Sequence, residues 1–184
     1  MACLACVATA LLVTTSSFAQ SQRGIKGKKA PKLEVDKWLQ LPAAAVKNKK
    51  KSVDIKDYKG KVVYMFFFQS ACPGCREHGF PTIQKLKAKY KGDKKVAFVA
   101  IQTVNEGHSV NTPARGKEMA KRFKLDGIAI GHSDSREKKS VFNAYKPGGT
   151  PWTVVVDKKG IVRNNDYFLD PNQAIKVIES LKAE

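Results

Sequence analysis

Two cysteines separated by two residues are the part of this sequence best suited to chemistry. Cys72 and Cys75 enclose Pro73 and Gly74. A disulfide between cysteines this close would enclose a very short loop, so it would restrict the unfolded chain little. We therefore interpret the pair as a redox site, in which one thiolate attacks a disulfide and the other cysteine resolves the mixed disulfide.

The elements around this pair place it between a strand and a helix. Residues 62–68 (VVYMFFF) form a continuous apolar run, which is typical of a central strand covered on both faces. From Pro73 onward, apolar residues recur at helical spacing, with a kink expected at Pro81. The positive end of this helix would stabilise a thiolate at Cys72, so we expect Cys72 to attack and Cys75 to resolve.

The remaining pattern predicts an α/β fold with a central mixed sheet flanked by helices. The further expected elements are strands at 96–101 and 128–130, a helix from Pro113 capped by 111–112, a helix at 135–145, a hairpin of strands 152–156 and 161–167, and a final helix after Asp170-Pro171. The order is β-α-β-α-β-α-β-β-α.

The number and spacing of the cysteines and histidines disfavour a metal site. Half of a zinc site has the Cys-x-x-Cys spacing, but no second such pair completes it. The three histidines, His78, His108 and His132, are dispersed along the chain. We expect no metal and no organic cofactor.

A second motif, Thr150-Pro151, follows two glycines and precedes strand 152–156. Together with Cys72 and Cys75 it resembles the thioredoxin superfamily, in which a Thr-Pro with a cis peptide bond faces the cysteine pair. The resemblance implies that Thr150 pairs its backbone with the substrate and that Pro151 keeps this loop close to Cys72. Trp152 would line the substrate groove, with packing in the core as the alternative.

Within that superfamily the chain is similar to the TlpA-type redoxins. The similar segments are 57–63 (DYKGKVV), 72–75, Phe80-Pro81 and 154–157, and residues 111–130 fit an inserted helix-strand unit. The resemblance implies a thioredoxin-like domain over 32–184 and a thiol-disulfide oxidoreductase that acts on protein thiols or disulfides.

Two departures from the superfamily pattern concern proton transfer. Ala71 stands where a Trp usually precedes the first cysteine, and Phe66 stands where thioredoxin has a buried Asp. A proton acceptor must then come from elsewhere or from water. Two side chains near the cysteines on the same helix, Glu77 and His78, are the candidates for a proton shuttle.

The N-terminal sequence predicts export. Residues 1–19 contain no charge, their apolar part has the length of a signal-peptide core, and Ser17-Phe18-Ala19 suits cleavage. Cys3 and Cys6 would leave with this segment. We expect a periplasmic or otherwise exported protein, with a retained membrane anchor as the alternative.

The chain is strongly basic, with 34 Lys and Arg against 16 Asp and Glu, a net charge of +18. Residues 20–31 are basic and polar and are interpreted as a flexible tether. Because Arg is scarce and aromatic residues do not alternate with the basic runs, specific nucleic-acid binding is not expected. A basic surface favours acidic partners, and a membrane electron donor is a further candidate.

Three other functions stay open. A peroxidase of peroxiredoxin type would need Pro and Thr where Met65 and Gln69 stand. A copper-handling protein would combine Cys72 and Cys75 with His132, although that class has a Cys-x-x-x-Cys spacing. A non-catalytic basic binding module would keep its function after both cysteines are replaced.

Overall fold

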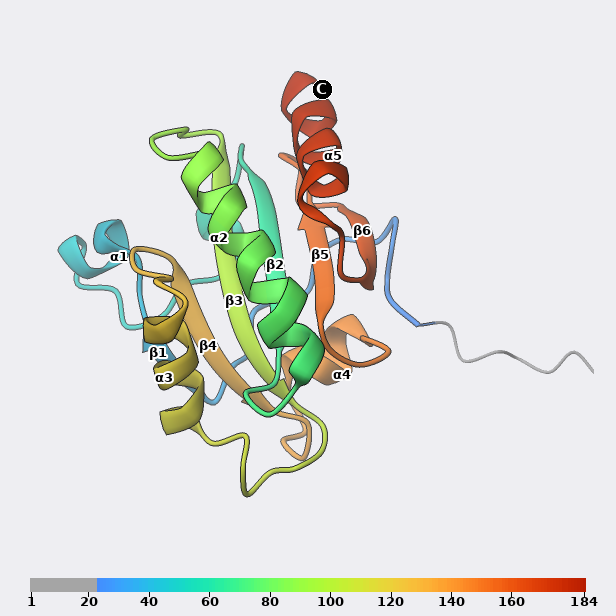
Figure 1. Ribbon diagram of the computed structural model, residues 1–184. Helices are drawn as coiled ribbons and strands as arrows, with labels where there is room; N and C mark the ends of the chain where they lie inside the picture. The colour runs from blue at the N-terminus through green and yellow to red at the C-terminus, as the bar shows by residue number, and fades with distance from the viewer. Residues whose placement is uncertain (1–22) are drawn as a thin grey trace, which may run out of the picture.

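A six-stranded mixed sheet forms the centre of the computed structural model, which describes residues 23–184 (Figure 1). The strands are β1 (Lys37–Gln40), β2 (Val62–Phe68), β3 (Val96–Val104), β4 (Ala129–Asp134), β5 (Trp152–Val156) and β6 (Val162–Tyr167). Their order is β1-β4-β3-β2-β5-β6. Strands β2, β3 and β4 are parallel and the other pairs antiparallel, so the carboxyl ends of three strands meet at one edge. The predicted α/β architecture with a central mixed sheet is confirmed.

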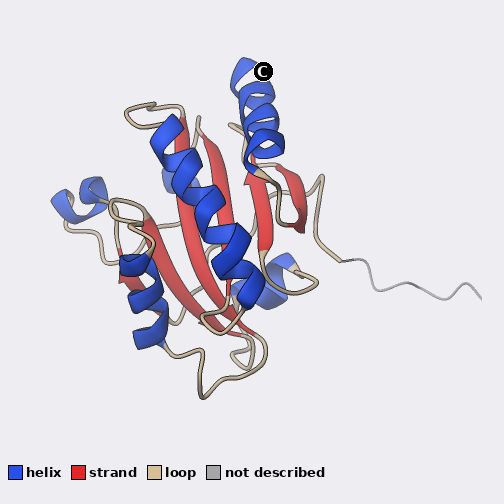
Figure 2. Cartoon of the chain, in the orientation of Figure 1, coloured by secondary structure: helices blue, strands red, loops and turns tan. Residues whose placement is uncertain are grey.

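Helices cover both faces of this sheet. They are α1 (Ala43–Lys47), α2 (Phe80–Lys89), α3 (Pro113–Arg122), α4 (Val141–Tyr145) and α5 (Pro171–Ala183), with a 3₁₀ turn η1 (Ile55–Tyr58) and a π-helical turn η2 (Cys75–Gly79). Helices α2, α3 and α5 lie on one face and α4 on the other (Figure 2). None of the helices within residues 23–184 is both long and apolar enough to cross a membrane.

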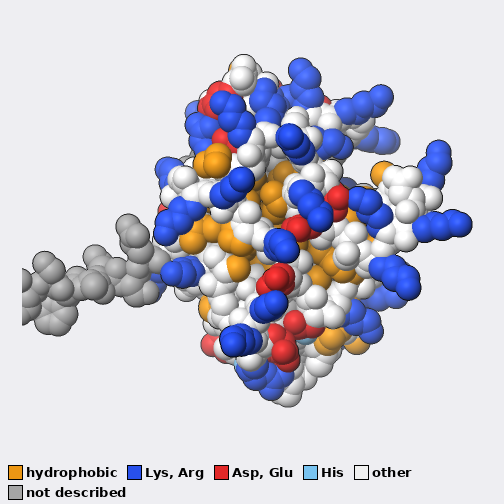
Figure 3. All heavy atoms as spheres, turned by 180° about the vertical axis from the view of Figure 1, so that it is seen from behind, with side chains coloured by type: hydrophobic (Ala, Val, Ile, Leu, Met, Phe, Trp, Pro, Cys, Tyr) orange, Lys and Arg blue, Asp and Glu red, His pale blue; other side chains and the backbone are white. Residues whose placement is uncertain are grey.

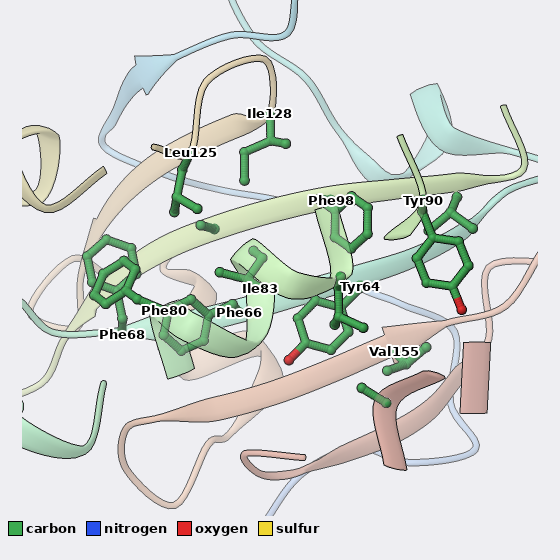
Figure 4. Close-up of a cluster of buried hydrophobic side chains, with 14 of the residues drawn as sticks. Tyr64, Phe66, Phe68, Phe80, Ile83, Tyr90, Phe98, Leu125, Ile128 and Val155 are labelled. Atoms are coloured by element: carbon green, nitrogen blue, oxygen red, sulfur yellow. The ribbon is translucent and has the colours of Figure 1, made fainter. Parts of the chain in front are cut away.

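Strand β2 supplies side chains to both halves of the core. All seven of its residues are buried. Because side chains alternate along a strand, the even-numbered ones pack under α2 and α5 and the odd-numbered ones pack toward α4. Figure 4 shows the first set, in which the rings of Phe66 and Phe80 meet edge to face with centroids 5.1 Å apart. This confirms the prediction of a central strand covered on both faces.

The segment interpreted as a flexible tether, residues 20–31, is attached to the domain where the structure describes it. The backbone N–H of Gly27 donates to the carbonyl of Val162 at 2.7 Å, and the Ile25 side chain is buried. This part of the chain therefore lies against β6 instead of extending freely. The predicted signal peptide and its two cysteines lie outside the described residues.

Helix α4 is shorter than the helix predicted at 135–145. The Ser140 hydroxyl accepts the backbone N–H of Asn143 at 3.2 Å and so caps the helix there. Before it, the Asp134 carboxylate accepts the backbone N–H of Arg136 at 2.9 Å, which fixes a turn. These polar side chains satisfy the backbone locally and delay the helix start.

One face of the domain carries many basic side chains. Figure 3 shows the face opposite to that of Figure 1, where Lys and Arg side chains are widely spread and Asp and Glu are fewer.

Candidate functional site

Cys72 and Cys75 lie between the end of β2 and the first turn of the following helix. Cys75 is completely buried in the core cluster beneath α2, whereas Cys72 is partly exposed, and both are free thiols. The backbone N–H of Cys75 donates to the Cys72 sulfur at 3.2 Å. Cys72 is therefore the sulfur that a disulfide of another molecule can reach.

The two thiols have opposite acidities. The pKa of Cys72 is lowered to about 6, chiefly by the hydrogen bond from the Cys75 thiol. Desolvation raises this pKa, whereas Thr150, the Cys75 N–H and the charge of Arg76 lower it further. Burial is the largest cause that raises the pKa of Cys75, and hydrogen bonding to Cys72 adds to it. At neutral pH the site therefore contains a thiolate at Cys72 and a protonated thiol at Cys75.

The helix that follows contains a π-helical turn over Cys75–Gly79 before α2 begins. Pro81 has no N–H to donate to the carbonyl of Glu77, so ordinary α-helical bonding cannot continue there. Where the sequence predicts a kink at Pro81, the helix contains a π-helical turn, which is wider and holds one extra residue. A Cβ at Gly79 would overlap the ring of Phe66, so glycine allows the helix to approach β2 this closely.

The Thr150-Pro151 loop faces the cysteine pair, and its peptide bond is cis, as the resemblance implies. The Cys72 sulfur lies 3.5 Å from the carbonyl oxygen of Thr150. A Cβ at Gly74 would lie 3.3 Å from Cδ of Pro151, which shows that this proline packs directly on the Cys-Pro-Gly-Cys turn. Thr150 and Pro151 are both partly exposed beside Cys72.

Trp152 does not line a substrate groove. Its side chain is 1% exposed and belongs to the core cluster on the α4 side of the sheet. The indole N–H donates to the side-chain oxygen of Asn165 at 2.5 Å, and the ring packs edge to face on Tyr167. The prediction of a substrate contact is wrong because both faces of β5 are covered, and alternation along the strand places Trp152 on the α4 side.

The two candidate proton shuttles, Glu77 and His78, are both exposed in the π-helical turn. The imidazole of His78 stacks on Phe168, with ring centroids 5.4 Å apart and 15° between the planes. Within residues 23–184 neither side chain forms a hydrogen bond to either cysteine. Phe66, in the place of the thioredoxin Asp, is fully buried between Phe68 and Phe80.

A buried polar network that the sequence did not reveal supports the loop before Cys72. The side-chain oxygen of Asn111 accepts the backbone N–H of Ala71 at 3.0 Å, and its amide donates to the Gln69 side chain at 3.1 Å. Asn111 is 3% exposed although it lies just before α3, far from Cys72 in the chain. The sequence indicated Asn111 only as part of a helix cap, a role that Thr112 performs.

Gln102 on β3 extends this network to His132 on β4. The fully buried Gln102 side chain accepts the Ser70 hydroxyl and approaches Nδ1 of His132 at 3.0 Å. Burial lowers the pKa of His132, so the imidazole is neutral at neutral pH. Among residues 23–184 no group of three or more His, Cys, Asp or Glu side chains is arranged to hold a metal ion.

A cysteine pair at the start of a helix, opposite a cis proline and on this sheet, defines a protein of thioredoxin-like fold with a dithiol site. The family model described as Redoxin matches residues 25–179. The chain belongs to the Redoxin family.

Solved structures of related fold agree with this assignment. A thioredoxin-like superfamily protein is 27% identical, with a TM-score of 0.72 over 85% of this chain and 97% of its own. A thiol-disulfide isomerase from Corynebacterium glutamicum is 26% identical, with a TM-score of 0.72 over 86% and 97%. The thioredoxin domain of a thiol-disulfide oxidoreductase from Bacteroides vulgatus, 22% identical with a TM-score of 0.61 over 84% and 98%, shows the fold alone. No curated protein was found to match.

Proposed function

We propose that this thioredoxin-like oxidoreductase exchanges dithiols and disulfides with protein partners through Cys72 and Cys75. The observation that supports this most is the difference between the two sulfurs. Cys72 is partly exposed with a pKa of about 6, whereas Cys75 is buried with a raised pKa, and the backbone N–H of Cys75 donates to the Cys72 sulfur at 3.2 Å. An accessible thiolate next to a protected thiol is the arrangement that disulfide exchange requires.

In the reducing direction the Cys72 thiolate attacks one sulfur of the partner disulfide. A Cys72–partner bond forms, the partner S–S bond breaks, and the other partner sulfur leaves as a thiolate that takes a proton from solvent. Cys75 then loses its proton and attacks the Cys72 sulfur, which releases the second partner thiol and leaves a Cys72–Cys75 disulfide. Another protein dithiol returns this disulfide to the thiol form by the reverse exchange.

We propose that Thr150 and Pro151 position the partner chain. The Thr150 carbonyl lies 3.5 Å from the Cys72 sulfur, so an extended partner segment that paired with the backbone here would place its own sulfur beside Cys72. The packing of Pro151 against Gly74 fixes the distance between loop and thiolate.

The experiment that tests the exchange measures the redox state of the purified chain in glutathione buffers of defined potential, by mass spectrometry after thiol alkylation. We expect a Cys72–Cys75 disulfide that forms and disappears with the potential, and turnover of protein disulfides that Cys72→Ser abolishes. Turnover that persists in Cys72→Ser would contradict the proposal. A binding function that is unaffected when both cysteines are replaced would favour a non-catalytic module.

We also propose that the chain is exported and acts outside the cytoplasm, on the basis of the uncharged N-terminal sequence. The mass of the protein recovered from the producing cell tests this. A chain that begins at Gln20 in the exported fraction is expected, and a full-length chain confined to the cytoplasm would contradict it.

A further inference from the structure

A pocket of about 380 Å³ lies next to the loop that precedes Cys72. Ala71, the residue immediately before the attacking cysteine, forms one side of it, and α3 forms the opposite side. A partner chain that brings a sulfur to Cys72 therefore places its neighbouring residues within reach of this pocket.

The pocket collects an unusual share of the arginines of the chain. The sequence contains six arginines among 34 basic residues, and three of the six line this pocket: Arg76, Arg115 and Arg122. A guanidinium group presents a planar fork of N–H donors that matches a carboxylate, whereas the ammonium group of lysine is a point charge. The choice of arginine here, in a chain otherwise rich in lysine, points to recognition of carboxylates.

One acidic side chain in the lining offsets the positive charge of the three arginines only in part. Glu118 is the one acidic residue in the lining, and its carboxylate pairs with Arg115 at 2.8 Å. Both members of that pair are more than half exposed, so the pair is weak and open to exchange. Val110, which is 53% exposed, adds an apolar surface at the rim that suits the methylene groups of an acidic side chain.

We propose that this pocket selects partner proteins with an Asp or Glu side chain within a few residues of the cysteine that reacts with Cys72. The inference rests on the proposed exchange function and specifies its substrate class. Arg115 and Arg122 bind the carboxylate, and Val110 contacts its methylene groups. Arg76 has a second role, since its charge also lowers the pKa of Cys72.

The test uses the reduced full-length chain with Cys3 and Cys6 replaced by serine, so that Cys72 and Cys75 are its only cysteines. The substrates are synthetic peptides whose single cysteine is joined by a disulfide to 5-thio-2-nitrobenzoate. Attack by Cys72 on the peptide sulfur releases thionitrobenzoate, which absorbs visible light and reports the rate of the first step. Peptides with Glu, Gln or Lys beside the cysteine are compared at low salt. We expect the Glu peptide to react about fivefold to tenfold faster than the Gln peptide, and the Lys peptide to react more slowly than both.

Variants of the pocket residues test whether the preference for the Glu peptide arises in this pocket. The double variant Arg115→Gln with Arg122→Gln should lose the preference, so that the Glu and Gln peptides react at the same rate. Glu118→Gln should increase the preference, because it releases Arg115. The control is Lys94→Gln with Lys159→Gln, which removes the same charge from two exposed positions. Lys94 lies just before β3 and Lys159 just after β5, at the strand ends away from the cysteines, so this variant should keep the preference for the Glu peptide.

The outcomes separate the two proposals. No reaction with any peptide would contradict the exchange function itself. Reaction at equal rates with Glu and Gln peptides would overturn the carboxylate pocket and leave the exchange function in place. An equal loss of preference in the lysine control would also overturn it, because the effect would then come from net charge alone.

Discussion

Replacing Cys75 by alanine should make Cys72 less acidic. With a pKa of about 6, Cys72 is about 90% thiolate at pH 7, whereas a thiol with the ordinary value of 9.0 would be about 1% ionised. The hydrogen bond from the Cys75 thiol is the largest cause of this lowered pKa, so its loss moves the pKa back toward 9.0. Because Thr150, the backbone N–H of residue 75 and Arg76 remain, the new value stays below the ordinary one.

The assay is the rate of alkylation of Cys72 by iodoacetamide as a function of pH, followed by mass spectrometry. In the wild type the rate should rise with pH through about 6 and then level off, with Cys75 unlabelled. For Cys75→Ala the midpoint should move upward, and a pKa higher by about one lowers the rate about tenfold on the acid side. Cys75→Ser, which keeps a donor, should lie between the two. A midpoint that stays the same or falls in Cys75→Ala would refute the reasoning.

Three further predictions follow from the packing and the chemistry of the site. Cys75→Ser should accumulate mixed disulfides with partner proteins on non-reducing gels, because the resolving thiol is absent; a Cys72-dependent adduct that never appears would count against the exchange. Asn111→Ala should lower the free energy of unfolding by about 1–3 kcal/mol in urea titrations and slow the exchange, because it leaves the Ala71 N–H without its acceptor; full activity would show that the loop does not need this support. Gly79→Ala should destabilise the protein by about 1–3 kcal/mol through overlap with Phe66, and Phe66→Leu in the same chain should recover part of the loss; additive effects of the two changes would argue against that contact.

The active-site elements were largely predictable because their signals are local. The VVYMFFF run of β2, the helical spacing after Pro73 and the cap before Pro113 each depend on residues that are neighbours in the chain. Cys72, Cys75 and the Thr150-Pro151 loop could be placed together because the resemblance supplied the long-range pairing. The local patterns alone did not require these two loops to meet.

The parts that sequence reasoning missed depend on contacts between distant segments. Strand β1 has a mixed composition (KWLQ) and becomes a strand by pairing antiparallel with β4. The position of Trp152 directly after Pro151 suggests a groove residue, but β5 is covered on both faces and Trp152 is buried. Asn111 gives no sign in the sequence that it hydrogen bonds to Ala71, which is 40 residues earlier.

The π-helical turn over Cys75–Gly79 has a consequence for comparisons between relatives. One additional residue in a helix rotates everything beyond it by about 100° relative to what precedes it, and a widened turn absorbs that rotation. Residues before the turn keep their alignment with the thiols, and residues from Phe80 onward keep theirs with the sheet. If a sequence alignment of relatives places its gap on the wrong side of this turn, residues that face the core are matched with residues that face solvent. Roles assigned to Glu77 or His78 by alignment therefore need a structural superposition.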